Sequence, residues 1–130
     1  MAKELVARGT GASPGEATGQ IVFTAQDAVA FAKEGKSVIF VRMETTSEDV
    51  PGLQAAAGIL TTRGGITGDA AIVARTLGKP CIASCSQMRV DYTGGGSLTV
   101  LRDSAKGDDL VLKKGAVVTI NGATGQIWTE

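Results

Sequence analysis

Hydrophobic positions in the first part of the chain alternate between short apolar runs and a stretch with one apolar face. The segments GQIVFT (19–24) and SVIFVR (37–42) are rich in β-branched and aromatic residues, which is typical of strands. The segment AQDAVAFAKEG between them has helical spacing and ends near Gly35. This pattern predicts a strand, a helix near 25–34 and a second strand.

The next segment, TTSEDVPGLQAAAG, predicts a weaker helix. Ser47 is a suitable N-cap and is followed by acidic residues that suit a first helical turn, so we expect a helix over 47–57. Pro51 and Gly52 weaken or break this helix, and Gly58 is placed to end it.

The remaining segments complete an α/β pattern. Apolar runs at 58–61 and 80–84 predict two short buried strands, and the segment between them predicts a helix near 68–77 that Gly78 closes. The last third of the chain predicts strands separated by Gly and Asp turns, in SLTVLR, LVL, AVVTI and QIWTE. We therefore expect an α/β fold, a layered mixed sheet with helices packed on it.

Length and composition favour one folded domain. The 130 residues are within the usual size of a domain, so we expect residues 1–130 to form a single one. Apolar residues make up 43% of the chain and aromatic residues only 4%, which predicts a core of Val, Ile, Leu and Ala.

Charge and hydropathy argue against nucleic acid and membranes as partners. The 13 basic and 13 acidic residues cancel, and no run of like charge stands out. No apolar run approaches the ~18 residues that a membrane-spanning helix needs, and the first residues lack the apolar core of a signal peptide. We therefore expect a cytoplasmic protein.

The chain contains no histidine and only two cysteines, Cys81 and Cys85. Two cysteines four residues apart do not complete a metal site, so we expect two buried, reduced thiols, no metal and no cofactor. Without histidine, Ser/His and Cys/His catalysis within this chain is excluded.

One glycine-rich segment, LTTRGGITGDAAIVAR, has the features of an anion-binding turn. A strand ends, Gly64 and Gly65 permit a tight turn, and a helix begins near 67–69. The N–H groups at a helix start, near Gly68, attract phosphate. The guanidinium of Arg63 can donate two further hydrogen bonds to the same phosphate. The same residues also suit plain turn chemistry, and neither the Walker pattern nor the dinucleotide-binding glycine pattern is present.

Four segments occur in an order that resembles a known family: GASPGEATGQIVF, VRMETTSEDVPGL, GILTTRGGITGDAAIVARTLGKPCIASC and INGATGQI. They resemble the mobile phosphohistidine domain of the phosphoenolpyruvate-utilising enzymes, most of all the pyruvate, phosphate dikinases. The resemblance implies a swivelling β/β/α domain. It also implies two partner domains, in cis or in trans: an ATP-grasp-type nucleotide-binding domain and a barrel that binds phosphoenolpyruvate or pyruvate.

The resemblance also assigns roles within the glycine-rich segment. The family's phosphoryl-accepting histidine falls on Asp69, and the small hydroxyl residue before it falls on Gly68. Thr67 matches a threonine that is a target of regulatory phosphorylation in plant dikinases. The chain is then a degenerate carrier used for docking or regulation, or a piece of a larger phosphotransferase. The alternatives are that Asp69 is itself a phosphoryl acceptor, or that it only stabilises the helix start.

Other residues in the resembling segments have ordinary structural interpretations. Residues 13–15 suit a turn, and Arg42 with Glu44 suits a solvated pair at a strand end. Arg75 suits a helix surface with its stem over the core, and Trp128 suits a core or strand-edge anchor.

Overall fold

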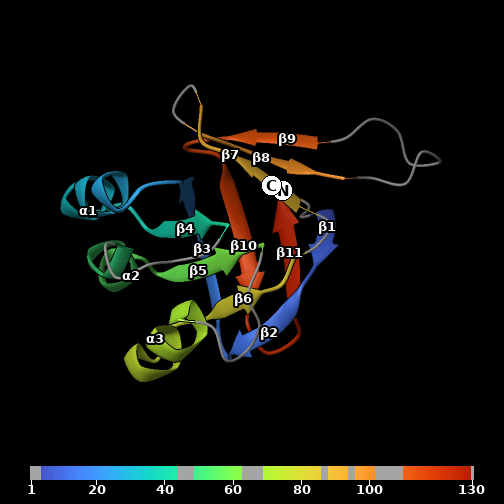
Figure 1. The fold of residues 1–130 in the computed structure, drawn as a ribbon, viewed down its shortest axis with the longest axis horizontal. Coiled ribbons are helices and arrows are strands. Elements are labelled where there is room, and N and C mark those ends of the chain that lie inside the picture. The colour runs from blue at the N-terminus through green and yellow to red at the C-terminus, as the bar shows by residue number, and fades with distance from the viewer. Residues whose placement is uncertain are drawn as a thin grey trace.

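The computed structural model describes residues 4–43, 49–62, 69–85, 88–93, 96–101 and 110–129. These ranges contain a large mixed sheet, a small antiparallel sheet and three helices. The helices all lie on one side of the large sheet, and the small sheet lies apart from them (Figure 1). The predicted α/β class is confirmed, with the layered mixed sheet and its helices.

The large sheet has eight strands in the order β1-β11-β10-β3-β4-β5-β6-β2. Strands β3 to β6 are parallel neighbours, and the other pairings in the sheet are antiparallel. The bounds of the strands are β1 (Glu4–Arg8), β2 (Thr10–Ser13), β3 (Glu16–Val22), β4 (Val38–Arg42), β5 (Gly58–Thr61), β6 (Cys81–Ala83), β10 (Val117–Asn121) and β11 (Gln126–Thr129).

The small sheet has three antiparallel strands in the order β7-β8-β9. Their bounds are β7 (Met88–Asp91), β8 (Ser97–Val100) and β9 (Leu110–Lys113). The turn before β8 fits tightly against the large sheet: Gly96 has a φ of +105°, and a Cβ there would lie 2.2 Å from the ring of Phe23. A side chain at this position would collide with the core, so the close approach requires glycine.

Helices α1 (Ala25–Lys33) and α3 (Asp69–Leu77) agree with the predicted spans to within a residue. The hydroxyl of Thr24 accepts a hydrogen bond from the backbone N–H of Asp27 at 3.1 Å, which caps α1. Gly35 follows α1 with a φ of +80°, and Gly78 follows α3 with a φ of +70°, as expected for helix ends.

Helix α2 (Val50–Ala55) is shorter than the predicted 47–57. Asp49 is the N-cap residue, and Pro51 lies in the first turn, where its missing N–H costs nothing. Ser47, the expected N-cap, lies outside the described residues. Gly58 does not end the helix; it begins β5 instead, because Ala56 has already left the helical conformation.

The end of α2 is held by Lys79 rather than by a glycine. The ammonium of Lys79 donates hydrogen bonds to the carbonyls of Leu53, at 3.2 Å, and of Gln54 and Ala56. These carbonyls have no partner within so short a helix, so a cation satisfies them well.

Each face of the large sheet carries its own core. One core joins sheet residues to the three helices and includes Val22, Phe40, Leu53, Ile59 and Ala74. The other joins the sheet to β7 and β8 and includes Ile21, Val41, Leu60, Met88 and Leu98. Aliphatic residues dominate both cores, as the composition predicts.

The two outermost described segments lie side by side. Strands β1 and β11 pair antiparallel, with Leu5 opposite Trp128. Trp128 is partly buried and lies on a strand flanked by β1 and β10, so it anchors the sheet. Among the described residues, no helix is long and apolar enough to cross a membrane.

Candidate functional site

The carboxyl ends of the parallel strands β3 to β6 meet at one edge of the large sheet, which we call the carboxyl edge. It is formed by Phe23, Arg42, Thr61 and Ser84, each at or just after the end of its strand. Each of α1, α2 and α3 follows one of these strands and therefore begins at the same edge. Such an edge is where open α/β sheets bind ligands.

The glycine-rich segment lies between β5 and α3 in the sequence. Asp69 is the first residue of α3, as the sequence predicts. The proposed phosphate-binding and regulatory residues before it, Arg63, Gly64, Gly65, Thr67 and Gly68, lie outside the described residues.

Arg42 is the best-defined charged side chain at this edge. Its Nη1 donates a hydrogen bond to the carbonyl oxygen of Phe23 at 2.8 Å, and its Nε lies 3.4 Å from Oδ2 of Asp49. The Arg42 side chain is only 23% exposed and that of Asp49 only 8%. Arg42 is therefore only partly solvated, because it forms an ion pair with the buried Asp49. Glu44, its expected partner, lies outside the described residues.

Tyr92 completes the surroundings of Arg42 from the small sheet. The guanidinium carbon of Arg42 lies 4.5 Å from the centroid of the Tyr92 ring, a cation–π contact. The Tyr92 hydroxyl accepts a hydrogen bond from the backbone N–H of Met43 at 2.7 Å. The small sheet is thus attached to the carboxyl edge through one side chain that contacts both a cation and the backbone.

Ser84, just after β6, has a backbone conformation that L-residues rarely adopt. Its φ is +53°, and no other non-glycine residue in the described ranges has a positive φ. The next residue, Cys85, donates its backbone N–H to the carbonyl of Thr61 at 3.3 Å, which holds Ser84 beside the end of β5. A strained residue at this edge is consistent with a functional role, because strain persists only where surrounding contacts enforce it.

Cys81 and Cys85 are both buried, and neither forms a disulfide bond, as expected. Burial raises the pKa of the Cys81 thiol to about 12, against a smaller lowering by the positive charge of Arg75. A thiol with such a pKa is protonated and inert at neutral pH. Arg75 itself is exposed on α3. Ser13 ends β2, and residues 14–15 connect it to β3, with Gly15 at a φ of +125°.

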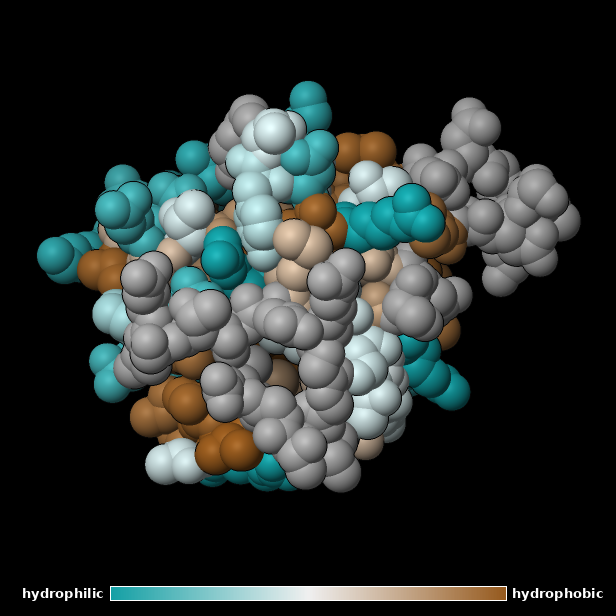
Figure 2. All heavy atoms as spheres, in the orientation of Figure 1, coloured by the Kyte–Doolittle hydropathy of each residue, from teal (hydrophilic) through white to brown (hydrophobic). Residues whose placement is uncertain are grey.

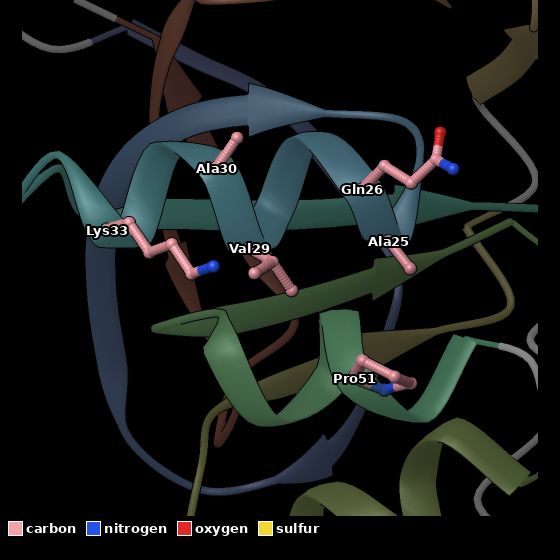
Figure 3. Close-up of a pocket in the computed structure, with 6 residues that line it drawn as sticks. All are labelled: Ala25, Gln26, Val29, Ala30, Lys33 and Pro51. Atoms are coloured by element: carbon pink, nitrogen blue, oxygen red, sulfur yellow. The ribbon is translucent and has the colours of Figure 1, made fainter.

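A hollow of about 480 Å³ lies between α1 and α2. Figure 3 shows the side chains of Val29 and Lys33 directed toward α2, with Pro51 across from them. Six residues line it: Ala25, Gln26, Val29, Ala30, Lys33 and Pro51. Lys33 carries the only charge among these six, so the hollow offers mainly apolar contact.

Helix α3 presents apolar side chains to solvent. Ile72 is 50% exposed and Leu77 is 40% exposed, and Figure 2 shows a hydrophobic area over this helix. The exposed strip belongs to the same helix that begins with Asp69. Exposed apolar groups of this kind often mark contacts with other protein surfaces.

Sequence reasoning missed the environment of Arg42 and the strain at Ser84. The position of Arg42 after a buried apolar run was a usable signal, because a charged residue at the end of a parallel strand lies at a ligand-binding edge. Nothing in the sequence indicates the contact with Tyr92, which is fifty positions away.

Comparison with known proteins agrees with this architecture. The family model of the PEP-utilising enzyme, mobile domain, matches residues 34–125. The chain is 48% identical over 125 residues to pyruvate, phosphate dikinase 1, chloroplastic, of Arabidopsis thaliana, which covers 96% of this chain and 12% of the relative. Identity to pyruvate, phosphate dikinase of Rhizobium meliloti (strain 1021) is 46%, covering 96% of this chain and 13% of the relative.

A third relative, pyruvate, phosphate dikinase 2 of Oryza sativa subsp. japonica, is 51% identical over 124 residues, which are 95% of this chain and 13% of the relative. The chain therefore spans only about an eighth of the length of these relatives. The resemblance noted in the sequence is confirmed, and this chain belongs to the family of PEP-utilising enzyme mobile domains, of the kind found in pyruvate, phosphate dikinases.

Proposed function

We propose that this chain is a phosphoryl-carrier-type swivelling domain in which Asp69 occupies the acceptor position, so that it is a degenerate carrier. It then acts as a docking or regulatory module, or as a piece of a larger phosphotransferase. One observation carries the proposal: the 130 residues contain no histidine. A domain of this family without an imidazole cannot form phosphohistidine.

The chemistry of a carboxylate disfavours efficient transfer. Asp is shorter than His, and a displacement of ~1 Å at a reacting group can reduce the rate by about 100-fold. The carboxylate of Asp69 also brings negative charge toward a polyanionic donor. At the first position of α3, an acidic residue stabilises the helix instead, by about 0.3 to 2 kcal/mol.

The partners in this proposal are the two domains that the family resemblance implies, one that binds nucleotide and one barrel that binds phosphoenolpyruvate or pyruvate. The exposed apolar strip on α3 supports such docking, since Ile72 lies one turn beyond Asp69. The pairing of β1 with β11 joins the first and last described strands in one sheet, which suits a unit that moves as one body between partners.

The glycine-rich turn has two roles in the proposal. Gly64, Gly65 and Gly68 let the backbone approach a phosphate, and Arg63 adds charge. Thr67 is a target for regulatory phosphorylation, as the plant threonine is. The turn holds an anion weakly, because the carboxylate of Asp69 opposes it.

The decisive experiment measures phosphoryl uptake. The chain is mixed with ³²P-labelled phosphoenolpyruvate and the separately produced nucleotide-binding and barrel domains of a relative. We expect no label at a useful rate on the unaltered chain and an acid-labile label on Asp69→His. Because Gly68 loosens the helix start, the double variant Gly68→Ser with Asp69→His is expected to take up label faster.

The alternative, an active aspartyl-phosphate carrier, predicts a different result. An acyl phosphate is cleaved by hydroxylamine, so a stoichiometric, hydroxylamine-sensitive label on the unaltered chain would overturn the proposal. Loss of that label in Asp69→Ala would identify Asp69 as the acceptor.

A further inference from the structure

The guanidinium of Arg42 is restrained on three sides at the carboxyl edge. Its contacts are the carbonyl of Phe23 at 2.8 Å, the carboxylate of Asp49 at 3.4 Å and the ring of Tyr92 at 4.5 Å. These contacts already restrict the rotamers of this long side chain. Ligand binding therefore costs little further side-chain entropy. Arg42 is therefore preorganised before any ligand arrives.

Much of the donor capacity of Arg42 is unused within the described part of the chain. An arginine has five N–H donors, and here only Nη1 donates a hydrogen bond to a described residue. The buried Nε has no hydrogen-bond partner, although Asp49 lies within ion-pair range. Unmade hydrogen bonds on a charged group are costly, so an added acceptor would be favourable.

The surroundings admit that acceptor from one direction. The Arg42 side chain is 23% exposed, whereas its Nε is buried, so an added acceptor would bind at the terminal nitrogens of the guanidinium. Helix α1 begins two residues after Phe23, and its N-terminal end adds a positive field at the same edge. The carboxylate of Asp49 opposes this field and limits the affinity.

We infer that Arg42 is an oxyanion-binding residue of the carboxyl edge and that its ligand is a phosphate or phosphomonoester group. The planar fork of a guanidinium matches two oxygens of a tetrahedral phosphate, which a lysine ammonium cannot do. The inference rests on the proposed function for its choice of ligand. A phosphoryl group brought to the start of α3 by a partner domain arrives at the edge that Arg42 also occupies.

Tyr92 is a positioning residue in this inference. Its ring lies against the guanidinium, and its hydroxyl is held by the backbone N–H of Met43 at 2.7 Å. Tyr92→Phe keeps the ring and removes this hydrogen bond, so it is expected to weaken phosphate binding less than Arg42→Gln does.

The test titrates the whole chain, without partner domains, with inorganic phosphate and separately with phosphoenolpyruvate. Nuclear magnetic resonance follows the backbone N–H signals of Met43 and Tyr92, which are present in the unaltered chain and in every variant of Arg42. We expect a saturable shift with both probes, and an affinity reduced by about tenfold in Arg42→Gln and Arg42→Lys. Asp49→Asn is expected to raise the affinity, because it removes the opposing charge; a purely structural ion pair would not produce these opposite effects.

Arg89 provides the matched control, since it is an exposed arginine on β7. Arg89→Gln is expected to bind phosphate as the unaltered chain does, and sodium chloride at equal ionic strength is expected to give no saturable shift. Unchanged phosphate affinity in Arg42→Lys, with a well-dispersed spectrum, would overturn the inference. This titration measures binding and not phosphoryl transfer. A phosphoryl label on Asp69 in the transfer experiment would therefore refute the proposed function without changing the measured phosphate affinity of Arg42. Likewise, an unchanged affinity in Arg42→Lys would refute this inference without changing the transfer result.

Discussion

Cys81 and Cys85 are four residues apart, yet they pack into the two cores on opposite faces of the large sheet. Cys81 lies under the helices, and Cys85 lies on the side of the small sheet. Their spacing in the sequence therefore does not bring them together, and each thiol is a small apolar group in its own core.

The buried thiol of Cys81 makes stability depend on alkaline pH. Its folded pKa of about 12 is above the ordinary value of 9.0, so the folded state favours the protonated thiol. This contribution is fully present below pH 9 and is lost as the pH rises toward 12. We expect the free energy of unfolding to fall across that range, by an amount on the order of 4 kcal/mol at most. Urea unfolding at several pH values measures it, and a Cys81→Ala variant with an equally steep fall would contradict it.

Lys79 is expected to be the main support of the short helix α2. Lys79→Met removes the cation that satisfies three carbonyls near the helix end. The expected loss is about 2 kcal/mol of unfolding free energy, measured by chemical denaturation. Lys113→Met is the control, because Lys113 is exposed on β9 and the described residues show no partner for it. Equal losses in the two variants would show that the contacts of Lys79 do not matter.

The backbone strain at Ser84 can be measured with two variants. Ser84→Ala and Ser84→Gly both remove the hydroxyl, but only glycine adopts a φ of +53° without steric cost. We therefore expect Ser84→Gly to be more stable than Ser84→Ala by about 1 kcal/mol. Thermal unfolding gives the difference, and equal melting temperatures would indicate that residue 84 is unstrained in solution.

The packing of β2 against the turn between β10 and β11 requires glycine at position 122. A Cβ on Gly122 would lie 1.8 Å from the carbonyl oxygen of Ser13, which cannot move aside as a flexible side chain can. Gly122→Ala is expected to lose about 3 kcal/mol of unfolding free energy. Gly115→Ala serves as the control for a simple φ effect, since Gly115 has a φ of +96° and open space around it. It is expected to lose only about 1 to 2 kcal/mol, and a smaller loss in Gly122→Ala would contradict the clash.

The alternation of strand and helix was predictable because its signals are local. Apolar runs mark β4 and β5, and one-faced spacing marks α1 and α3, each closed by a glycine with positive φ. Strands β1, β2 and β7 were not predicted, because segments such as TGAS have little apolar content. They are strands because β11, β6 and β8 supply hydrogen-bond partners from distant parts of the chain.

The site was predictable only in part. The start of α3 at Asp69 follows from the glycine-rich turn and the apolar face after it. The inward direction of Arg42 depends on Asp49 and on Tyr92 of the small sheet, and no local pattern shows that this sheet lies against the end of β4. Long-range packing thus decided what the side chain of Arg42 contacts.

We propose that this domain has the fold of a phosphoryl carrier and that Asp69 is not a competent acceptor. The most direct test replaces the mobile domain of the Rhizobium meliloti relative with residues 1–130, in the unaltered form and with Asp69→His. Transfer of the phosphoryl group from ³²P-labelled phosphoenolpyruvate to nucleotide is then measured for both chimeras. We expect no turnover with Asp69 and measurable turnover with Asp69→His. Turnover with Asp69, abolished by Asp69→Ala, or no turnover in a folded Asp69→His chimera, would contradict it.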